Sequence, residues 1–201
     1  MINVSAADYA WAEDEDYNEI PQEYCLTLVQ GLSPWEFLHR IGAEAGPAVT
    51  GIRALAERTW PREDSGMCIG VSEINGWALG VEINGFLGVR EEINVPLSAG
   101  TRLVSHFRNV NAVSDFVWRE DGDLRLGFDP LFAGTRYGSA PDALLEVMAA
   151  IGFTITDRDE DAEDFGAVID GAYALAEHLT GIRITPGFLT TATYQCGIVH
   201  R

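Results

Sequence analysis

The chain has 201 residues, and its 31 acidic and 13 basic side chains give a formal net charge of −18 at pH 7. A surface of this sign repels the phosphates of nucleic acids, so we expect a basic protein partner and no nucleic acid. The sequence contains no apolar run long enough to cross a bilayer and no signal-peptide pattern at its N-terminus. We therefore expect a cytoplasmic protein that has no membrane segment.

The order of the predicted elements indicates a single α+β domain over residues 1–201. The hydrophobic fraction of 47% is typical of a globular protein. We expect a helical N-terminal part (1–65), a mainly antiparallel, twisted sheet of about six strands (66–130) and a helical C-terminal part (131–201). The sequence does not indicate an oligomeric state.

Three helices are predicted in the N-terminal part. Pro21 suits the first turn of a helix that ends near Gly31, because apolar residues recur between them at helical spacing. Ser33 and Pro34 are typical of the cap and first turn of a second helix. A third helix is expected over Thr50–Thr59.

Two Asn-Gly pairs, Asn75-Gly76 and Asn84-Gly85, lie between apolar runs. This dipeptide accepts positive φ at both central turn positions and favours a tight hairpin. Two such turns in succession predict a three-stranded meander. One face of its middle strand is large and apolar (Trp77, Leu79, Val81 and Ile83). Small residues on the opposite face let a helix approach closely or form the floor of a pocket.

The remaining elements follow from alternation and from helical spacing. Alternating apolar residues predict strands at about 101–110, 113–119 and 124–128. Helices are expected at about 142–151 and 162–180, and Pro186 suits the start of a last helical turn.

Arg102, His106 and Arg108 share one face of the strand predicted at 101–110. Two arginines beside a histidine would bind a carboxylate or a phosphate, because the guanidinium group offers a planar fork of donors. We expect Asp115 of the next strand on the same face. The alternative is a solvent-exposed face on which these residues form cross-strand ion pairs.

Acidic residues are concentrated towards both ends of the chain. The two groups are Glu13, Asp14, Glu15 and Asp16, and Asp157, Asp159 and Asp161. Because chain ends often lie close together on a domain, the two groups could form one patch that steers a basic partner. The alternative is a surface that serves solubility alone.

The sequence shows no motif for a cofactor, a metal or a catalytic centre. The spacing of Cys25, Cys68 and Cys196 fits neither a zinc site nor a redox motif, and Cys25 and Cys68 suit buried structural thiols. The acidic run at 157–161 is similar to the start of a calcium loop but lacks the later glycine and glutamate. We expect no cofactor, no metal and no catalytic residue.

Four segments carry a resemblance to a known family. They are residues 24–32, the hairpin at 76–86, the run at 98–112 with its Ser-His-Phe-Arg-Asn-Val-Asn-Ala sequence, and residues 194–197. Together they resemble a family of actinobacterial proteins catalogued as a domain of unknown function, over nearly the whole chain. The resemblance implies one intracellular domain and brings no catalytic residues with it.

Two hypotheses about function remain. The first is a non-enzymatic, intracellular, acidic protein-binding module of the kind that immunity proteins and antitoxins represent. The second is a small-anion-binding protein or enzyme that uses Arg102, His106 and Arg108. A cleft over that strand face would favour the second hypothesis, whereas a flat acidic surface would favour the first.

Overall fold

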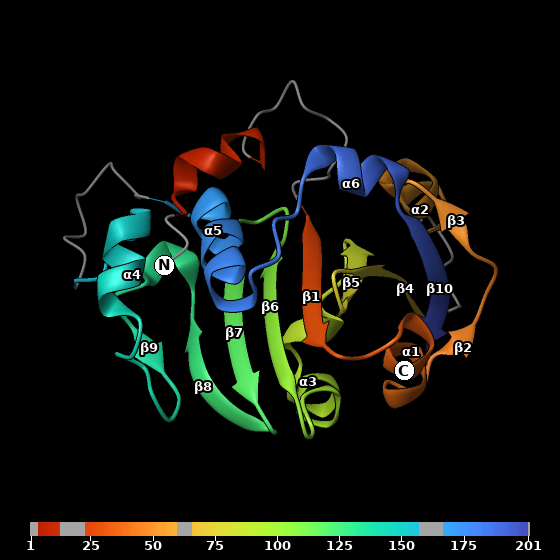
Figure 1. The fold of residues 1–201 in the computed structure, drawn as a ribbon, viewed down its shortest axis with the longest axis horizontal. Coiled ribbons are helices and arrows are strands. Elements are labelled where there is room, and N and C mark those ends of the chain that lie inside the picture. Colours follow the sequence, from red (N-terminus) through yellow and green to blue (C-terminus); the bar gives the residue numbers. More distant parts are fainter. Residues whose placement is uncertain (1–3, 13–22, 60–65, 157–166, 201) are drawn as a thin grey trace.

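The computed structural model describes residues 4–12, 23–59, 66–156 and 167–200, and Figure 1 shows their arrangement. The predicted α+β class with an antiparallel sheet is confirmed, although the sheet has ten strands and not about six. In chain order the elements are η1 (Ala6–Ala12), β1 (Tyr24–Gln30), α1 (Pro34–Arg40), β2 (Glu44–Ala45), β3 (Val49–Thr50), α2 (Ile52–Thr59), β4 (Met67–Ile74), β5 (Trp77–Ile83), η2 (Leu87–Val89), α3 (Glu91–Leu97), β6 (Arg102–Arg108), β7 (Ser114–Glu120), β8 (Asp123–Phe128), η3 (Pro130–Phe132), β9 (Arg136–Tyr137), α4 (Leu145–Ile151), α5 (Ile169–Thr180), α6 (Pro186–Thr191) and β10 (Thr193–Val199).

The sheet has the strand order β2-β10-β4-β5-β1-β6-β7-β8-β9, and β3 also pairs with β10. Each of these pairings is antiparallel. β1, from near the start of the chain, lies between β5 and β6, and β10, from its end, lies between β2 and β4. All three predicted parts of the chain therefore contribute strands to one sheet.

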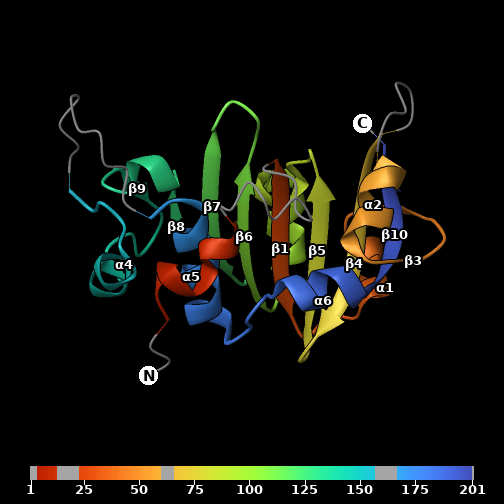
Figure 2. The ribbon, with the colours of Figure 1, turned by 90° about the horizontal axis from the view of Figure 1, so that it is seen from above.

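Helices cover both faces of the sheet (Figures 1 and 2). We call η1, α2, α4, α5 and α6 the front layer, and α1, η2 and α3 the back layer. The larger apolar core lies under the front layer and includes Leu55, Met148 and Tyr173. The smaller core lies under the back layer and includes Phe37 and Leu97. Residues of the same strand therefore enter different cores according to the strand's two-residue period.

The helix predicted from Pro21 to Gly31 is wrong, because Tyr24–Gln30 form the central strand β1. This strand pairs with β5 on one side and β6 on the other, and six of its seven residues are buried. A strand that is covered on both faces reads as a continuous apolar run and does not alternate. Its sequence therefore also fits the helical spacing that led to the wrong prediction.

The first Asn-Gly turn is confirmed, and the second is wrong. Asn75 and Gly76 have φ values of 47° and 80°, and they join β4 to β5 in a hairpin in which Ile74 pairs with Trp77. After Asn84 the chain leaves the sheet and forms η2. No third meander strand can form there, because β1 occupies the free edge of β5.

Several local predictions hold. The Ser33 hydroxyl oxygen accepts a hydrogen bond from the backbone N–H of Glu36 at 3.2 Å, which caps α1 as expected. Strands β6, β7 and β8 and helices α2, α4, α5 and α6 lie within or close to the predicted ranges. Among the described residues, no helix is long and apolar enough to cross a membrane.

Candidate functional site

The face of β6 that carries Arg102, His106 and Arg108 lies against the front layer. The Arg102 guanidinium group donates to Glu120 of β7 at 2.9 Å and to the backbone carbonyl of Leu179 in α5 at 3.1 Å. Arg102 and Glu120 are also direct partners in the register of β6 and β7. This arginine therefore forms the cross-strand ion pair that the alternative interpretation expected, and it also holds the end of α5 against the sheet.

His106 is buried beneath α5, with 1% of its surface exposed. Its Nδ1 atom lies 3.2 Å from the hydroxyl oxygen of Tyr24, and its ring meets the ring of Tyr173 edge-on at 4.6 Å. Burial lowers the pKa of His106 to about 3, because desolvation disfavours the charged form. The imidazole is therefore neutral at physiological pH and offers no positive charge to an anion.

Asp115 does not join this face, so that expectation is wrong. It pairs with Phe107 in the register of β6 and β7, and this places it on the back face of the sheet. There its carboxylate accepts a hydrogen bond from the Tyr137 hydroxyl group at 3.4 Å. Partial burial raises the pKa of Asp115 to about 6. Asp115 thus lies on the opposite face of the sheet from Arg102, His106 and Arg108.

The back face of the sheet carries a buried carboxyl group, Glu82 of β5, that the sequence analysis did not single out. Glu82 is fully buried, and its carboxyl oxygens accept hydrogen bonds from the backbone N–H groups of Leu87 at 3.1 Å and Gly88 at 3.3 Å. Burial raises the pKa of Glu82 to about 7, although the two hydrogen bonds act to lower it. Glu82 thereby attaches η2 to the sheet.

Three small polar side chains lie beside Glu82. The hydroxyl groups of Thr27 and Ser105 are 2.9 Å apart, and the Cys25 sulfur lies 3.6 Å from the Ser105 oxygen. All three are buried, and the backbone of Gly88 lies directly against them. This buried cluster could have been suspected from a glutamate on the small-residue face of a predicted strand. Because it has no access to solvent, we interpret it as a structural network.

The acidic patch proposed for the two chain ends cannot be placed. Its residues, Glu13, Asp14, Glu15, Asp16, Asp157, Asp159 and Asp161, lie outside the described parts of the chain. The prediction that they converge therefore remains a prediction.

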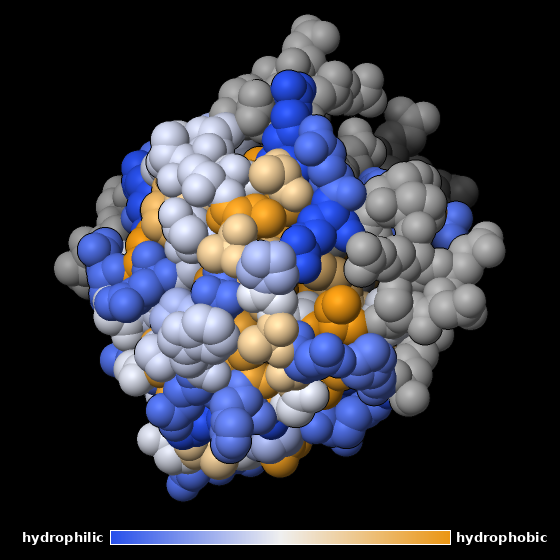
Figure 3. Space-filling model, turned by 90° about the vertical axis from the view of Figure 1, so that its right-hand side faces the viewer, coloured by the Kyte–Doolittle hydropathy of each residue, from blue (hydrophilic) through white to orange (hydrophobic). Residues whose placement is uncertain are grey.

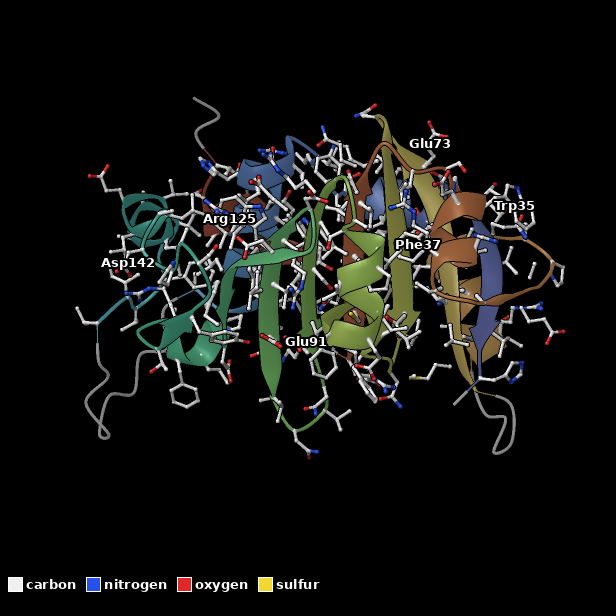
Figure 4. The ribbon with its side chains drawn as sticks, turned by 90° about the horizontal axis from the view of Figure 1, so that it is seen from below. Trp35, Phe37, Glu73, Glu91, Arg125 and Asp142 are labelled. Carbon is white, nitrogen blue, oxygen red and sulfur yellow. The ribbon has the colours of Figure 1, made fainter. Side chains whose placement is uncertain are left out.

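A hollow of about 550 Å³ lies on the surface beside α1 and β2. Its lining consists of Ser33, Trp35, Glu36, Leu38, His39, Ala43 and Ala45. Trp35 is 56% exposed, whereas Phe37, two residues later in the same helix, is 1% exposed. Figure 4 shows the two side chains, with Phe37 over the sheet and Trp35 at the outer side of α1. The hollow therefore presents a large aromatic side chain to solvent.

The hollow lies at one end of the sheet. Ala45 belongs to β2, which is the first strand in the sheet order and pairs with β10. Figure 3 views this end of the molecule and shows hydrophobic residues reaching the surface among hydrophilic ones. The apolar stripe of α1 contains Phe37 and Leu38 and leaves Trp35 outside it. That position outside the stripe is the sequence signal for an exposed tryptophan.

Comparison with known proteins identifies the family of the chain. Residues 2–201 match the Family of unknown function (DUF6461). The chain belongs to this family. No curated protein and no solved structure matches it. Membership of DUF6461 agrees with the resemblance to a family of unknown function and assigns no activity to any residue.

Proposed function

We propose that this DUF6461 protein is a non-enzymatic binding protein whose basic protein partner docks on the hollow at Trp35. The observation that carries the proposal is the exposure of Trp35 on the wall of an apolar hollow. Tryptophan is enriched among the residues that dominate binding energy, since it contributes a large apolar area and a polar N–H group. A partner side chain that fills the hollow would cover this surface.

The charge of the chain supports a basic partner. The net charge is −18, and two acidic side chains flank the hollow. Glu36 lines the hollow and Glu44 lies between two of its lining residues, with side chains that are 52% and 76% exposed. Glu36 pairs with Arg40 of the same helix at 3.0 Å, and Glu44 lies 3.1 Å from His200, so a partner would compete with these exposed pairs. Opposite charges around an apolar anchor speed association and fix the orientation of the partner, although exposed pairs add little affinity. We therefore expect a partner segment that carries an apolar anchor between lysine or arginine residues.

The geometry gives less support to the anion-binding hypothesis. His106 is neutral and covered by α5, and Arg102 already has a carboxylate partner. An anion would have to displace Glu120 and enter beneath a packed helix. The proposed binding protein, which we place in the cytoplasm, would resemble immunity proteins and antitoxins in using an acidic surface to hold a basic protein.

A peptide-display selection tests this function and does not require the partner to be identified first. Purified protein is presented with a random peptide library, and each enriched peptide is then tested separately for binding to the Trp35→Ala variant. Phe132→Ala is the matched control, because Phe132 is an aromatic residue of similar exposure, 54%, located in η3. We expect enriched peptides with an apolar anchor and basic neighbours, and we expect them to bind wild type and Phe132→Ala but not Trp35→Ala.

Two outcomes would contradict the proposal. One is enrichment of peptides that bind the Trp35→Ala variant as well as wild type. The other is enrichment of acidic peptides, which would reverse the expected charge complementarity. The thermal midpoint of Trp35→Ala should stay close to that of wild type, so loss of binding cannot be attributed to unfolding.

A further inference from the structure

Two of the three cysteines, Cys68 and Cys196, lie together on adjacent strands. In the register of β10 and β4, Cys196 pairs with Gly70 and Ile198 pairs with Cys68. The two cysteines are therefore diagonal neighbours on the same face of the sheet, since residues two apart in a strand point to the same side. The Cys68 side chain makes a hydrogen bond with that of Cys196. The two thiol groups are thus neighbours on this face of the sheet, and the Cys196 thiol also donates to the Tyr194 carbonyl at 3.8 Å.

The surroundings of this pair favour a thiolate. Arg58 of α2 acts electrostatically on Cys196. The two side chains lie close to the same point, because a Cβ atom built on Gly46 would lie 3.0 Å from the Arg58 guanidinium and 3.8 Å from Cys196 Cβ. The hydrogen bond from Cys68 and the charge of Arg58 lower the pKa of Cys196 to about 7. Cys196 itself is buried, but Cys68 is partly exposed. Solvent therefore reaches the pair from the side of Cys68.

We propose that Cys68 and Cys196 form a redox-sensitive pair that a peroxide converts into an intramolecular disulfide linking β4 to β10. This inference is independent of the hollow at Trp35. It rests on the register of the two strands, which places both thiols on one face of the sheet, and on the difference in exposure of the two residues.

The reaction balances with a hydroperoxide as the oxidant. In the reacting form the Cys68 thiol has released its proton to solvent, and the Cys196 thiol keeps its proton. The Cys68 thiolate attacks a peroxide oxygen, the O–O bond breaks, and the departing hydroxide takes the proton of the Cys196 thiol to become water. Cys68 is then a sulfenic acid. The Cys196 thiolate attacks the Cys68 sulfur, the S–O bond breaks, and the departing hydroxide takes back a proton from solvent to become the second water. Two thiols and one hydrogen peroxide thus give one disulfide and two waters.

Cys25 serves as an internal control for this chemistry. It is fully buried in β1 beneath the back layer, and burial raises the pKa of its thiol well above its usual value. A buried, protonated thiol reacts slowly with peroxide, because the thiolate is the nucleophile. The structure therefore predicts oxidation of two of the three cysteines.

The test oxidises the reduced full-length protein with hydrogen peroxide and counts the remaining thiols. After quenching, denaturation and alkylation with N-ethylmaleimide, the untreated chain should carry three labels and the treated chain one. The treated chain should have lost two hydrogen atoms, and peptide mapping should find Cys68 joined to Cys196 and Cys25 labelled. Arg58→Gln should slow the reaction about threefold to tenfold at pH 6, where the thiolate fraction follows the pKa. The matched control Arg53→Gln, on an exposed position of the same helix, should react at the wild-type rate.

Three results would overturn the proposal. They are retention of three labels after excess peroxide, oxidation of Cys25 as fast as the pair, and a disulfide that joins two chains. The Cys196→Ser variant provides a second check, because its Cys68 should stop at the sulfenic acid, which dimedone traps. If dimedone labels Cys68 of the Cys196→Ser variant no faster than it labels Cys68 of the wild type, Cys196 does not act as the resolving cysteine.

Discussion

His106 and Glu82 are both buried ionisable residues, but they lie on opposite faces of the sheet and have different surroundings. On the front face, His106 packs among aromatic rings and has one hydrogen-bonding neighbour, the hydroxyl group of Tyr24. On the back face, Glu82 accepts two backbone N–H groups and lies beside small polar side chains. Burial moves both groups towards their neutral forms, lowering the pKa of His106 to about 3 and raising that of Glu82 to about 7.

The comparison shows two ways in which a sheet attaches its covering layer. The front layer is held mainly by apolar and aromatic packing, in which His106 takes part as a neutral ring, and Arg102 adds one hydrogen bond to the end of α5. The back layer is held by hydrogen bonds as well, because Glu82 attaches η2 through Leu87 and Gly88. Neither residue meets solvent, so both act on stability. The accessible chemistry of the described chain lies elsewhere, at Trp35 and at Cys68.

The largest expected effect is the acid sensitivity that His106 confers. Its folded-state pKa is about 3, below the usual 6.5, so the unfolded chain binds a proton that the folded chain rejects. Stability is therefore lost as the pH falls from about 6.5 towards 3, by up to about 5 kcal/mol. Urea unfolding across this range should show a shallower decline for His106→Phe than for wild type. His39→Gln, at an exposed position, should decline like wild type. Equal declines in all three proteins would show that His106 is protonated in the folded state.

Glu82 should produce the opposite trend. Its folded-state pKa is about 7, above the usual 4.5, so the folded chain keeps a proton that the unfolded chain releases. The stabilisation is fully present below pH 4.5 and is lost as the pH rises to about 7, with a total on the order of 3 kcal/mol. Glu82→Gln should therefore gain stability relative to wild type between these pH values.

The exposed Glu73 provides the control for that trend. The difference in unfolding free energy between Glu73→Gln and wild type should not change between pH 4.5 and 7.5. If the difference in unfolding free energy between Glu82→Gln and wild type is also constant over this pH range, Glu82 is ionised in the folded protein across the whole range. The contrast between the two faces of the sheet would then disappear.

A smaller effect is expected where η2 meets the buried cluster. A Cβ atom on Gly88 would lie 1.8 Å from the Thr27 hydroxyl oxygen and 2.5 Å from that of Ser105. Gly88→Ala should therefore destabilise the fold by about 2 to 3 kcal/mol through overpacking. Gly187→Ala in α6 is the matched control, because its Cβ would meet no atom within 4 Å. Equal unfolding midpoints for the two variants would show that η2 does not pack against the cluster.

The sequence predicted the elements whose signals are local. The Asn75-Gly76 turn depends on positive φ values, and the cap at Ser33 depends on one side-chain oxygen, so neighbouring residues determine both. β1 was missed because burial on both faces removes alternation, and this burial is a property of the whole fold. The Asn84-Gly85 turn was overpredicted because β1 had taken the edge that a third strand needed.

The candidate sites depended even more on tertiary structure. His106 and its two arginines do share a strand face, as the period of a strand requires, but only the packing of α5 decides that His106 is closed off from solvent. The exposure of Trp35 and the contact of Cys68 with Cys196 arise between segments far apart in the chain. Residue type indicated which side chains could do chemistry, whereas access to solvent could be learned only from the fold.

The affinity of a selected basic peptide tests the proposed function most directly. Isothermal titration should show that Trp35→Ala weakens binding by about 2 kcal/mol or more, which is roughly a thirtyfold loss, because the anchor of the interface is removed. Phe132→Ala should bind like wild type, and high salt should weaken the binding of both through screening. Equal affinities for wild type and Trp35→Ala, together with insensitivity to salt, would contradict a basic partner docked on the hollow at Trp35.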